Sequence, residues 1–267
     1  MKIKNFKRKL KRSIIAIFCY WIVFSAFLYF AADFIIFRPS KEGLKSSHFS
    51  KISKNYEIKE IYQDQEKTLK AFFIPQKSEK IIIYFHGNVG VNAHIMAKNL
   101  FHKTDFNILI PTYFGYKPST GKASEENFYL SINEVMEYVI KSGWKTEDII
   151  IMGTSLGGAA AIYAASQYDN LDRTIVINTF DSIKSMCLEQ YYIFCIFANN
   201  IINSSQYAQK IEGKIFQFHS KIDETVPYDL GKKLFNKIKT KDKKFFDING
   251  THNDFSLDQI INYGSFQ

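Results

Sequence analysis

The turn Gly153-Thr154-Ser155-Leu156-Gly157 constrains the fold of this chain more than any other feature. It follows the apolar run DIIIM at residues 148–152 and opens an alanine-rich stretch, residues 156–168, that predicts a helix. G-x-S-x-G between a buried strand and a helix is typical of a strained turn that projects the serine hydroxyl above a sheet. The outer glycines are needed because a Cβ there would collide with neighbouring backbone. Ser155 is therefore a candidate nucleophile; a turn that serves only strand–helix packing is the alternative.

Strands and helices alternate through the rest of the chain, which predicts βαβ units and a mostly parallel sheet with helices on both faces. Residues 80–85 (KIIIYF) form a continuous apolar run, as expected for a strand buried on both faces. Two earlier strands are expected at residues 56–62 and 69–74. The remaining strands are expected at residues 106–110, 148–152, 173–177, 214–218 and 243–248, and the helices at residues 91–102, 124–140, 156–168, 228–238 and 254–261.

Residues 179–213 interrupt this alternation, because they contain no clear core strand but do contain the aromatic run YYIFCIFANNII. We expect a short cap inserted after the sixth strand. Its aromatic side chains, Tyr191, Tyr192 and Phe194, are candidates for contact with a substrate. Packing of the same side chains on the core is an equally favoured alternative.

A serine hydroxyl needs an adjacent base, which is itself oriented by an acid. His252 follows the strand at 243–248 and is the only histidine downstream of Asp223, which follows the strand at 214–218. The carboxyl ends of parallel strands meet at one edge of a sheet, so Ser155, Asp223 and His252 are expected to converge there. Asp181, after the strand at 173–177, is the rival acid, and Asp223 could instead cap the helix that follows it.

Acyl chemistry at Ser155 would also need donors for a developing oxyanion. The backbone N–H of Leu156 is one candidate. The second is the backbone N–H of Asn88, in the loop His86-Gly87-Asn88-Val89-Gly90, where His86 is expected to stabilise the loop rather than act as a second base. No second histidine lies at ligand spacing near the candidate acid and base, so no metal and no organic cofactor are expected.

The N-terminus predicts a membrane anchor. Residues 1–12 contain seven Lys and Arg and no acid, and residues 14–32 are nineteen residues without a charge, about 28 Å as a helix. A cleaved signal peptide is the less favoured alternative, because its apolar region would be shorter. We expect a basic cytoplasmic tail (1–12), an anchor (13–37), a polar tether (38–54) and a catalytic domain (55–267) on the periplasmic, extracellular or lumenal side.

The net charge of +9 belongs mainly to this tail, since without it the chain has 28 Lys and Arg against 26 Asp and Glu. The domain therefore lacks the strong positive charge of a nucleic-acid-binding protein, and no nucleic acid partner is expected. Cys187 and Cys195 lie eight residues apart. They could pair in an oxidising compartment, but buried free thiols are the favoured interpretation.

Six stretches resemble, in order, motifs of membrane-anchored α/β-hydrolase domain proteins related to acylglycerol lipases and palmitoyl-protein thioesterases. They read YFHGNVG, PTYFGYKPSTGKASEEN, IIIMGTSLGGAAA, VINTFDSI, HSKIDETVP and GTHND, between about residues 70 and 262. The resemblance implies an α/β-hydrolase fold and a Ser–Asp–His triad at Ser155, Asp223 and His252. The chain departs from the family at Phe114, where arginine is common beside the site, and at Ser220, where glycine is common. Phe114 is therefore a further candidate for contact with substrate.

The resemblance implies a serine hydrolase that cleaves small-molecule or lipid acyl esters or thioesters through an acyl-enzyme. A lipid esterase and a protein depalmitoylase are both open. A peptidase or amidase of the same fold is the alternative within enzymes. A catalytically idle, membrane-tethered binding protein is the alternative outside them.

Overall fold

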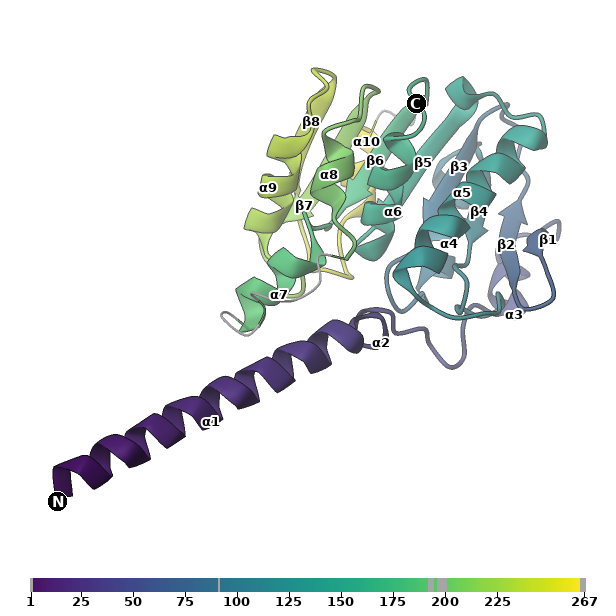
Figure 1. Cartoon of the computed structure of the whole chain (residues 1–267). Helices are drawn as coiled ribbons and strands as arrows, with labels where there is room; N and C mark the ends of the chain where they lie inside the picture. The colour runs from purple at the N-terminus through teal and green to yellow at the C-terminus, as the bar shows by residue number, and fades with distance from the viewer. Residues whose placement is uncertain (1, 91, 192–194, 196–200, 265–267) are drawn as a thin grey trace.

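The computed structural model describes residues 2–90, 92–191, 195 and 201–264. They form an eight-stranded sheet in the order β1-β2-β4-β3-β5-β6-β7-β8 (Figure 1). β1 and β2 form an antiparallel hairpin that pairs antiparallel with β4, and all other pairs are parallel. The strands are β1 (Glu57–Gln63), β2 (Thr68–Ile74), β3 (Ile81–Phe85), β4 (Asn107–Pro111), β5 (Ile149–Thr154), β6 (Arg173–Ile177), β7 (Ile215–Ser220) and β8 (Lys243–Ile248).

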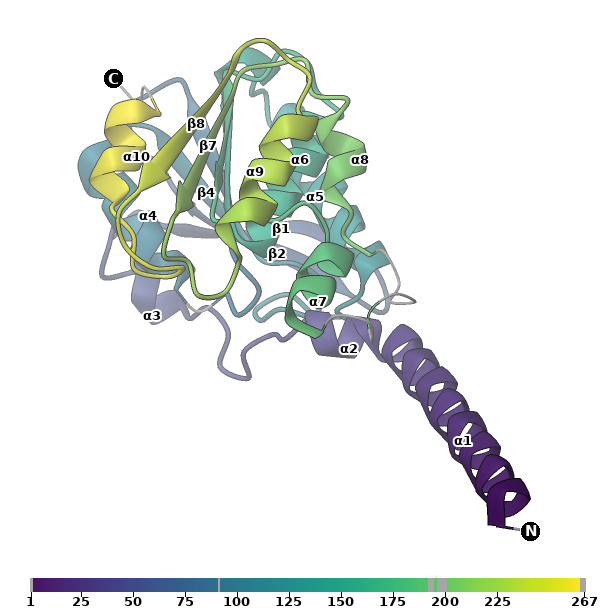
Figure 2. The same cartoon turned by 90° about the vertical axis from the view of Figure 1, so that its left-hand side faces the viewer.

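Helices cover both faces of this sheet, as Figure 2 shows. α3 (Ser46–Phe49), α4 (Ala93–Lys103) and α10 (Leu257–Tyr263) pack on one face. α5 (Glu125–Lys141), α6 (Leu156–Ala165), α8 (Ser204–Ala208) and α9 (Tyr228–Lys237) pack on the other, and a short 3-10 turn, Thr146–Asp148, precedes β5. Every residue of β3, β4, β5 and β7 is buried, which is why β3 and the first four residues of β5 read as continuous apolar runs. The predicted α/β architecture is confirmed.

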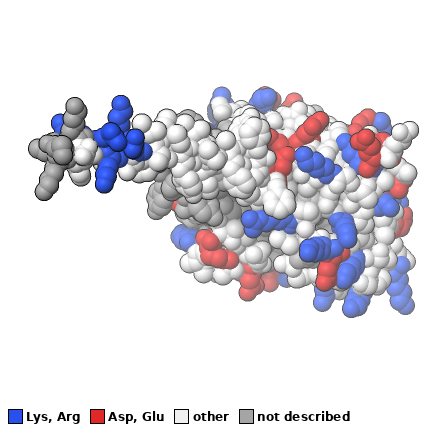
Figure 3. Space-filling view, turned by 60° about the horizontal axis from the view of Figure 1, so that its bottom comes forward, with Lys and Arg blue, Asp and Glu red and all other residues white. Residues whose placement is uncertain are grey.

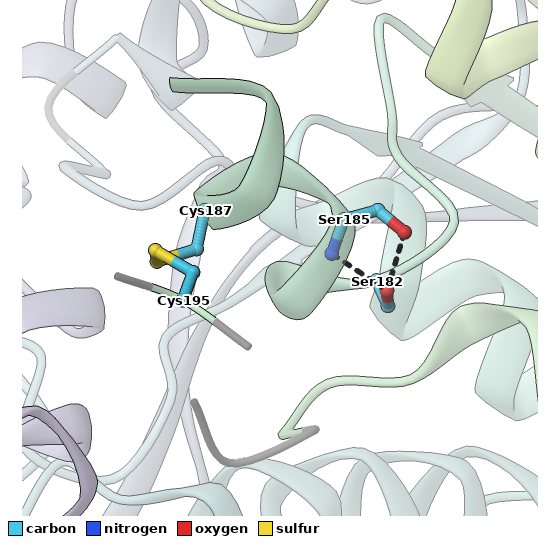
Figure 4. The surroundings of a disulfide bond; sticks show 4 residues. All are labelled: Ser182, Ser185, Cys187 and Cys195. Atoms are coloured by element: carbon cyan, nitrogen blue, oxygen red, sulfur yellow. Dashed lines mark hydrogen bonds between the residues drawn. A yellow bond between two sulfur atoms is a disulfide. The ribbon is translucent and has the colours of Figure 1, made fainter. Parts of the chain in front are cut away.

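The cap contains α7 (Ile183–Tyr191), which follows β6 after the loop at residues 178–182. Its first turn is held by Ser182, whose Oγ accepts a hydrogen bond from the Ser185 N–H at 3.1 Å (Figure 4). Further along, Cys187 and Cys195 form a disulfide with their Cα atoms 5.7 Å apart. The favoured interpretation of these cysteines as free thiols is therefore wrong, because the chain returns to α7 within eight residues. Tyr192 and Phe194 lie outside the described residues.

α1 (Lys2–Phe30) projects from the domain as one continuous helix (Figure 1). Its segment Asn5–Phe27 is long and apolar enough to cross a membrane. Apolar side chains stay exposed along it, Ile17 and Val23 among them, each 68% accessible. Basic residues gather toward the free end of α1, whereas both signs of charge mix over the domain (Figure 3). The division of charge inferred from the sequence holds in three dimensions.

The chain between α1 and β1 is packed more closely than a polar tether requires. It contains α2 (Ala32–Ile36) and α3, and it buries Phe37, Leu44 and Phe49. The ring of Phe49 stacks on that of Phe72 in β2, with ring centroids 3.9 Å apart. These apolar residues are too sparse and irregularly spaced to give a periodic signal, so the sequence alone does not predict their burial.

Candidate active site

Ser155 lies between β5 and α6 with φ 56° and ψ −119°, a conformation that few residues other than glycine adopt. Two of the hydrogen bonds that fix it come from the neighbouring strand β6 and the loop after it. The Ser155 N–H donates to the carbonyl of Ile177 at 2.9 Å, and the hydroxyl of Thr179 donates to the Ser155 carbonyl at 2.8 Å. Backbone strain of this kind persists only where surrounding contacts enforce it, and it concentrates at functional sites.

The glycines that flank Ser155 leave room for backbone to pass. A Cβ on Gly153 would lie 1.9 Å from the carbonyl oxygen of Gly157, and one on Gly157 would lie 1.9 Å from that of Phe85. Such approaches are impossible for any side chain, as the sequence argument anticipated. The strained turn and the end of β3 are therefore pressed together, and the loop after β3 is brought beside Ser155.

His252 and Asp223 are in direct contact. Nδ1 of His252 lies 2.8 Å from Oδ2 and 3.0 Å from Oδ1 of Asp223, whose side chain is fully buried. Oδ1 also accepts the backbone N–H groups of Thr225 at 2.8 Å and Val226 at 2.7 Å. A carboxylate held in this way accepts the Nδ1–H of the imidazole, so Nε2 is left as the proton acceptor.

The rival acid, Asp181, is engaged elsewhere. Its Oδ2 accepts a hydrogen bond from the hydroxyl of Ser185 and forms an ion pair with Nζ of Lys233, each at 2.8 Å. Glu224 does approach His252, but its Oε2 accepts the backbone N–H at 3.1 Å and does not orient the ring. Among the candidate acids, Asp223 is the one whose carboxylate contacts the imidazole.

Two further residues brace the loop that carries His252. Asn178, fully buried and with φ 46°, donates from Nδ2 to the His252 carbonyl at 3.1 Å and accepts the Ser220 N–H at 2.9 Å. The hydroxyl of Ser220 bonds to the carbonyl of Gly250. Ser220 thus performs a bracing role at the position where the family commonly has glycine. No sequence pattern indicates a role for Asn178, and the serine in place of glycine is the one signal at Ser220.

Ser155, Leu156, Asn88 and His252 line one cavity of about 720 Å³. This volume lies in the usual range for small-molecule sites. The other walls are largely apolar and come from α2, α4 and α7 and from the loop after β6; they include Ile35, Ile36, Ile95, Met96, Phe180, Ile183 and Met186. The structure therefore brings the candidate nucleophile, base and oxyanion donors to one apolar pocket, with Asp223 behind His252.

Both candidate oxyanion donors border this cavity. Leu156 is the first residue of α6, where N–H groups lack intrahelical acceptors and the helix dipole favours negative charge. A Cβ on Gly87 would lie 3.6 Å from Cβ of Ser155, so the loop that contains Asn88 runs beside the nucleophile. Among the described residues, the N–H groups of Asn88 and Leu156 have no protein acceptor. They are available to an oxyanion.

His86 is buried and its Nδ1 donates to the carbonyl of Gly87 at 2.7 Å. Burial lowers the pKa of His86 to about 4, so the ring is neutral at physiological pH. The hydroxyl of Tyr113 donates to the His86 carbonyl at 2.9 Å. These contacts match the loop-stabilising role expected from the sequence.

Among the predicted substrate-contact residues, Phe114 is the one whose side chain the structure describes. Phe114 is 1% exposed and does not line the cavity; its ring packs against Tyr62, with centroids 5.7 Å apart, and beneath Nζ of Lys67. Tyr191 ends α7, and its side chain is not described. Tyr192 and Phe194 lie outside the described residues, so their predicted role stays a prediction.

The segment after α1 supplies pocket residues that the sequence did not suggest. Ile35, Ile36 and Arg38 line the cavity. Asn88 fastens this segment through its side chain: Oδ1 accepts the Arg38 N–H at 2.9 Å and the Tyr116 hydroxyl at 2.8 Å, and Nδ2 donates to the Ile36 carbonyl at 2.5 Å. No periodic pattern marks these residues, because they come just after the uncharged apolar run at residues 14–32.

The chain is similar in sequence and in fold to several known proteins. Residues 80–193 match the family described as alpha/beta hydrolase fold. Protein bem46 of Schizosaccharomyces pombe is 31% identical over 76% of this chain and 72% of its own length. The uncharacterized membrane protein YNL320W of Saccharomyces cerevisiae is 30% identical over 63% of this chain and 62% of its own length. A solved esterase of Pyrococcus furiosus superposes with a TM-score of 0.64 at 16% identity, over 86% of this chain and 92% of that one.

Proposed function

The chain belongs to the α/β-hydrolase family, and from that premise we propose that it is a membrane-anchored serine hydrolase that cleaves carboxylic ester or thioester bonds. The family and the esterase structures that share the fold support a hydrolase. One observation carries the finer proposal. A serine in a strained elbow and a histidine oriented by a buried carboxylate line the same pocket.

In the proposed cycle, Nε2 of His252 takes the proton of Ser155 as the hydroxyl attacks the acyl carbonyl. Asp223 keeps the imidazole in the required tautomer and stabilises its charged form. The N–H groups of Leu156 and Asn88 bind the oxyanion. The imidazolium protonates the leaving alcohol or thiol, and water then releases the acid from the acyl-enzyme. No step in this cycle requires a metal or an organic cofactor.

Lipophilic acyl groups are the proposed substrates. Met96 and Ile95 of α4 face the cavity from one side, and Ile183 and Met186 of α7 line it from the cap. These side chains offer an acyl chain dispersion contacts and removal from water but no partners for a polar side group.

We further propose that α1 spans a membrane with its N-terminus in the cytoplasm and the domain on the opposite side. The basic residues at the start of α1 support this orientation. The Cys187–Cys195 disulfide gives independent support, because such bonds persist in oxidising compartments.

Fluorophosphonate labelling of the full chain in lipid vesicles tests the catalytic proposal. We expect labelling of wild type and none of Ser155→Ala. Ser166→Ala is the matched control, because Ser166 lies at the opposite end of α6 and should label normally. Failure of folded wild type to label would leave a binding protein of the same fold. Turnover of aminoacyl amides without turnover of p-nitrophenyl acyl esters would replace the esterase with a peptidase.

A further inference from the structure

The connection between the membrane helix and the domain is docked in place. We refer to residues 33–38 as the linker segment. Oδ1 of Asp33 accepts the backbone N–H of Glu125, at the start of α5, at 3.2 Å. Phe37 is 4% exposed and packs against Phe128 of α5, with ring centroids 5.8 Å apart. The linker segment is therefore fixed to the domain at both of its ends.

Between these two attachments the linker segment reaches the pocket in two ways. The side chains of Ile35 and Ile36 form part of its apolar wall. The backbone of Ile36 and Arg38 bonds to the side chain of Asn88, whose own N–H is the proposed second oxyanion donor. The residues that follow the membrane helix thus contact both the acyl-binding surface and the loop that stabilises the reaction's charge.

The distance from the membrane is short. The apolar span of α1 ends at Phe27, and Ile35 comes eight residues later, about 12 Å of helical rise at most. The interfacial layer outside the hydrocarbon core of a bilayer is about 5–8 Å thick on each side. Phe30 and Phe34, 85% and 86% exposed, occupy the intervening turns. α2 and α7 lie at the end of the domain from which α1 departs (Figures 1 and 2).

We propose that the linker segment is a working part of the active site and that the pocket takes its substrate from the bilayer surface. The substrate class is an amphiphile with a long-chain acyl ester or thioester, whose chain passes from lipid to the wall formed by Ile35 and Ile36. This route keeps the acyl chain out of water throughout. The linker segment also fixes Asn88 in position for the oxyanion. The inference rests on the proposed hydrolase function.

Two sets of point variants in the full chain, reconstituted in phosphatidylcholine vesicles, test the two roles. Ile35→Ser with Ile36→Ser should lower kcat/KM for a dodecanoyl ester relative to an acetyl ester about tenfold, through KM. Ile58→Ser, on an exposed face of β1, is the matched control. Asn88→Ala keeps the backbone N–H but loses the side-chain bonds, so kcat should fall about tenfold for both esters. Asn88→Asp can still accept the hydrogen bonds from the Arg38 N–H and the Tyr116 hydroxyl, so its kcat should lie between those of Asn88→Ala and wild type.

A cleavage variant tests entry from the membrane. A protease site inserted between Phe30 and Ala31, at the turn between α1 and α2, allows the domain to be released from vesicles with its linker segment intact. After cleavage, hydrolysis of a soluble acetyl ester should stay within twofold of the uncut chain. Hydrolysis of a fluorogenic long-chain acyl ester embedded in the vesicles should fall at least tenfold.

Each outcome bears on a separate statement. Equal loss on both ester lengths in the isoleucine variants would remove the linker segment from the acyl wall. An unchanged kcat in Asn88→Ala would remove its positioning role. Unchanged turnover of the embedded ester after release would exclude entry from the bilayer. If the uncut wild type neither labels with fluorophosphonate nor cleaves any ester, the proposed function is wrong, and the inference that rests on it is wrong as well.

Discussion

Replacement of Asp223 by asparagine probes the orientation of the proposed base. In the structure, Oδ1 of Asp223 accepts two backbone N–H groups, from Thr225 and Val226, and both oxygens lie within 3.0 Å of Nδ1 of His252. An asparagine has only one acceptor oxygen. The two N–H groups require that oxygen, so the amide NH₂ must face the imidazole.

The imidazole would then accept a hydrogen bond at Nδ1 and carry its proton on Nε2, the wrong tautomer for a base at Ser155. We expect kcat to fall about 10³–10⁴-fold, as for the same change in other serine hydrolase triads. This equals about 4–5.5 kcal/mol of lost transition-state stabilisation. Folding stability should change much less, because the backbone N–H groups keep an acceptor.

The assay is kcat/KM for a soluble p-nitrophenyl ester, measured as a function of pH. Asp181→Asn is the matched control, because Asp181 is also a buried aspartate in a loop that follows a strand, but it contacts Ser185 and Lys233 instead of His252. The Asp181→Asn variant should keep kcat/KM within about tenfold of wild type, because loss of this carboxylate affects the site only through α7. A larger loss in Asp181→Asn than in Asp223→Asn would refute the assignment of the acid.

Three further outcomes are expected. Asn178→Ala removes the bonds to His252 and Ser220 and should lower kcat up to about 10²-fold, measured with the same ester; an unchanged kcat would deny Asn178 a positioning role. The double variant Cys187→Ser/Cys195→Ser loses the disulfide, and its free energy of unfolding in urea titrations should be about 2.5 kcal/mol lower than that of wild type. Without a reductant, maleimide should not modify either of these cysteines in wild type. Burial lowers the pKa of His86 to about 4, whereas the same side chain in the unfolded protein has a pKa of about 6.5, so between these two pH values the unfolded state binds one more proton. The free energy of unfolding should therefore be at its full value above pH 6.5 and should fall by about 3 kcal/mol as the pH is lowered to 4. His86→Gln should flatten this part of the profile of stability against pH.

The sequence predicts those parts of the molecule that depend on local pattern. The buried strands and the glycines around Ser155 follow from residue types within a few positions of one another. The order of Ser155, Asp223 and His252 along the chain was enough to anticipate the contact between the last two.

The features that the sequence does not predict are contacts between segments that lie far apart in the chain. Asn178 acts by joining the ends of β6 and β7 to the His252 loop, and nothing near it in the chain indicates those partners. The disulfide depends on where the chain turns back after α7. Ile35 and Ile36 read as the end of an anchor, because a hydropathy pattern does not distinguish contact with lipid from contact with a pocket.

The position of β8 at the edge of the sheet, last in the chain, has a consequence for biosynthesis. The loop that carries His252 follows β8 and is tied to the end of β7 by the bond between Ser220 and Gly250, so it has no place to dock until β7 and β8 have both been made. A nascent chain that has completed only the elbow around Ser155 holds a hydroxyl with no base. If the protein is the hydrolase proposed above, the unfinished chain would therefore leave the lipids around it intact, and it would become reactive only once β8 and the His252 loop have been made.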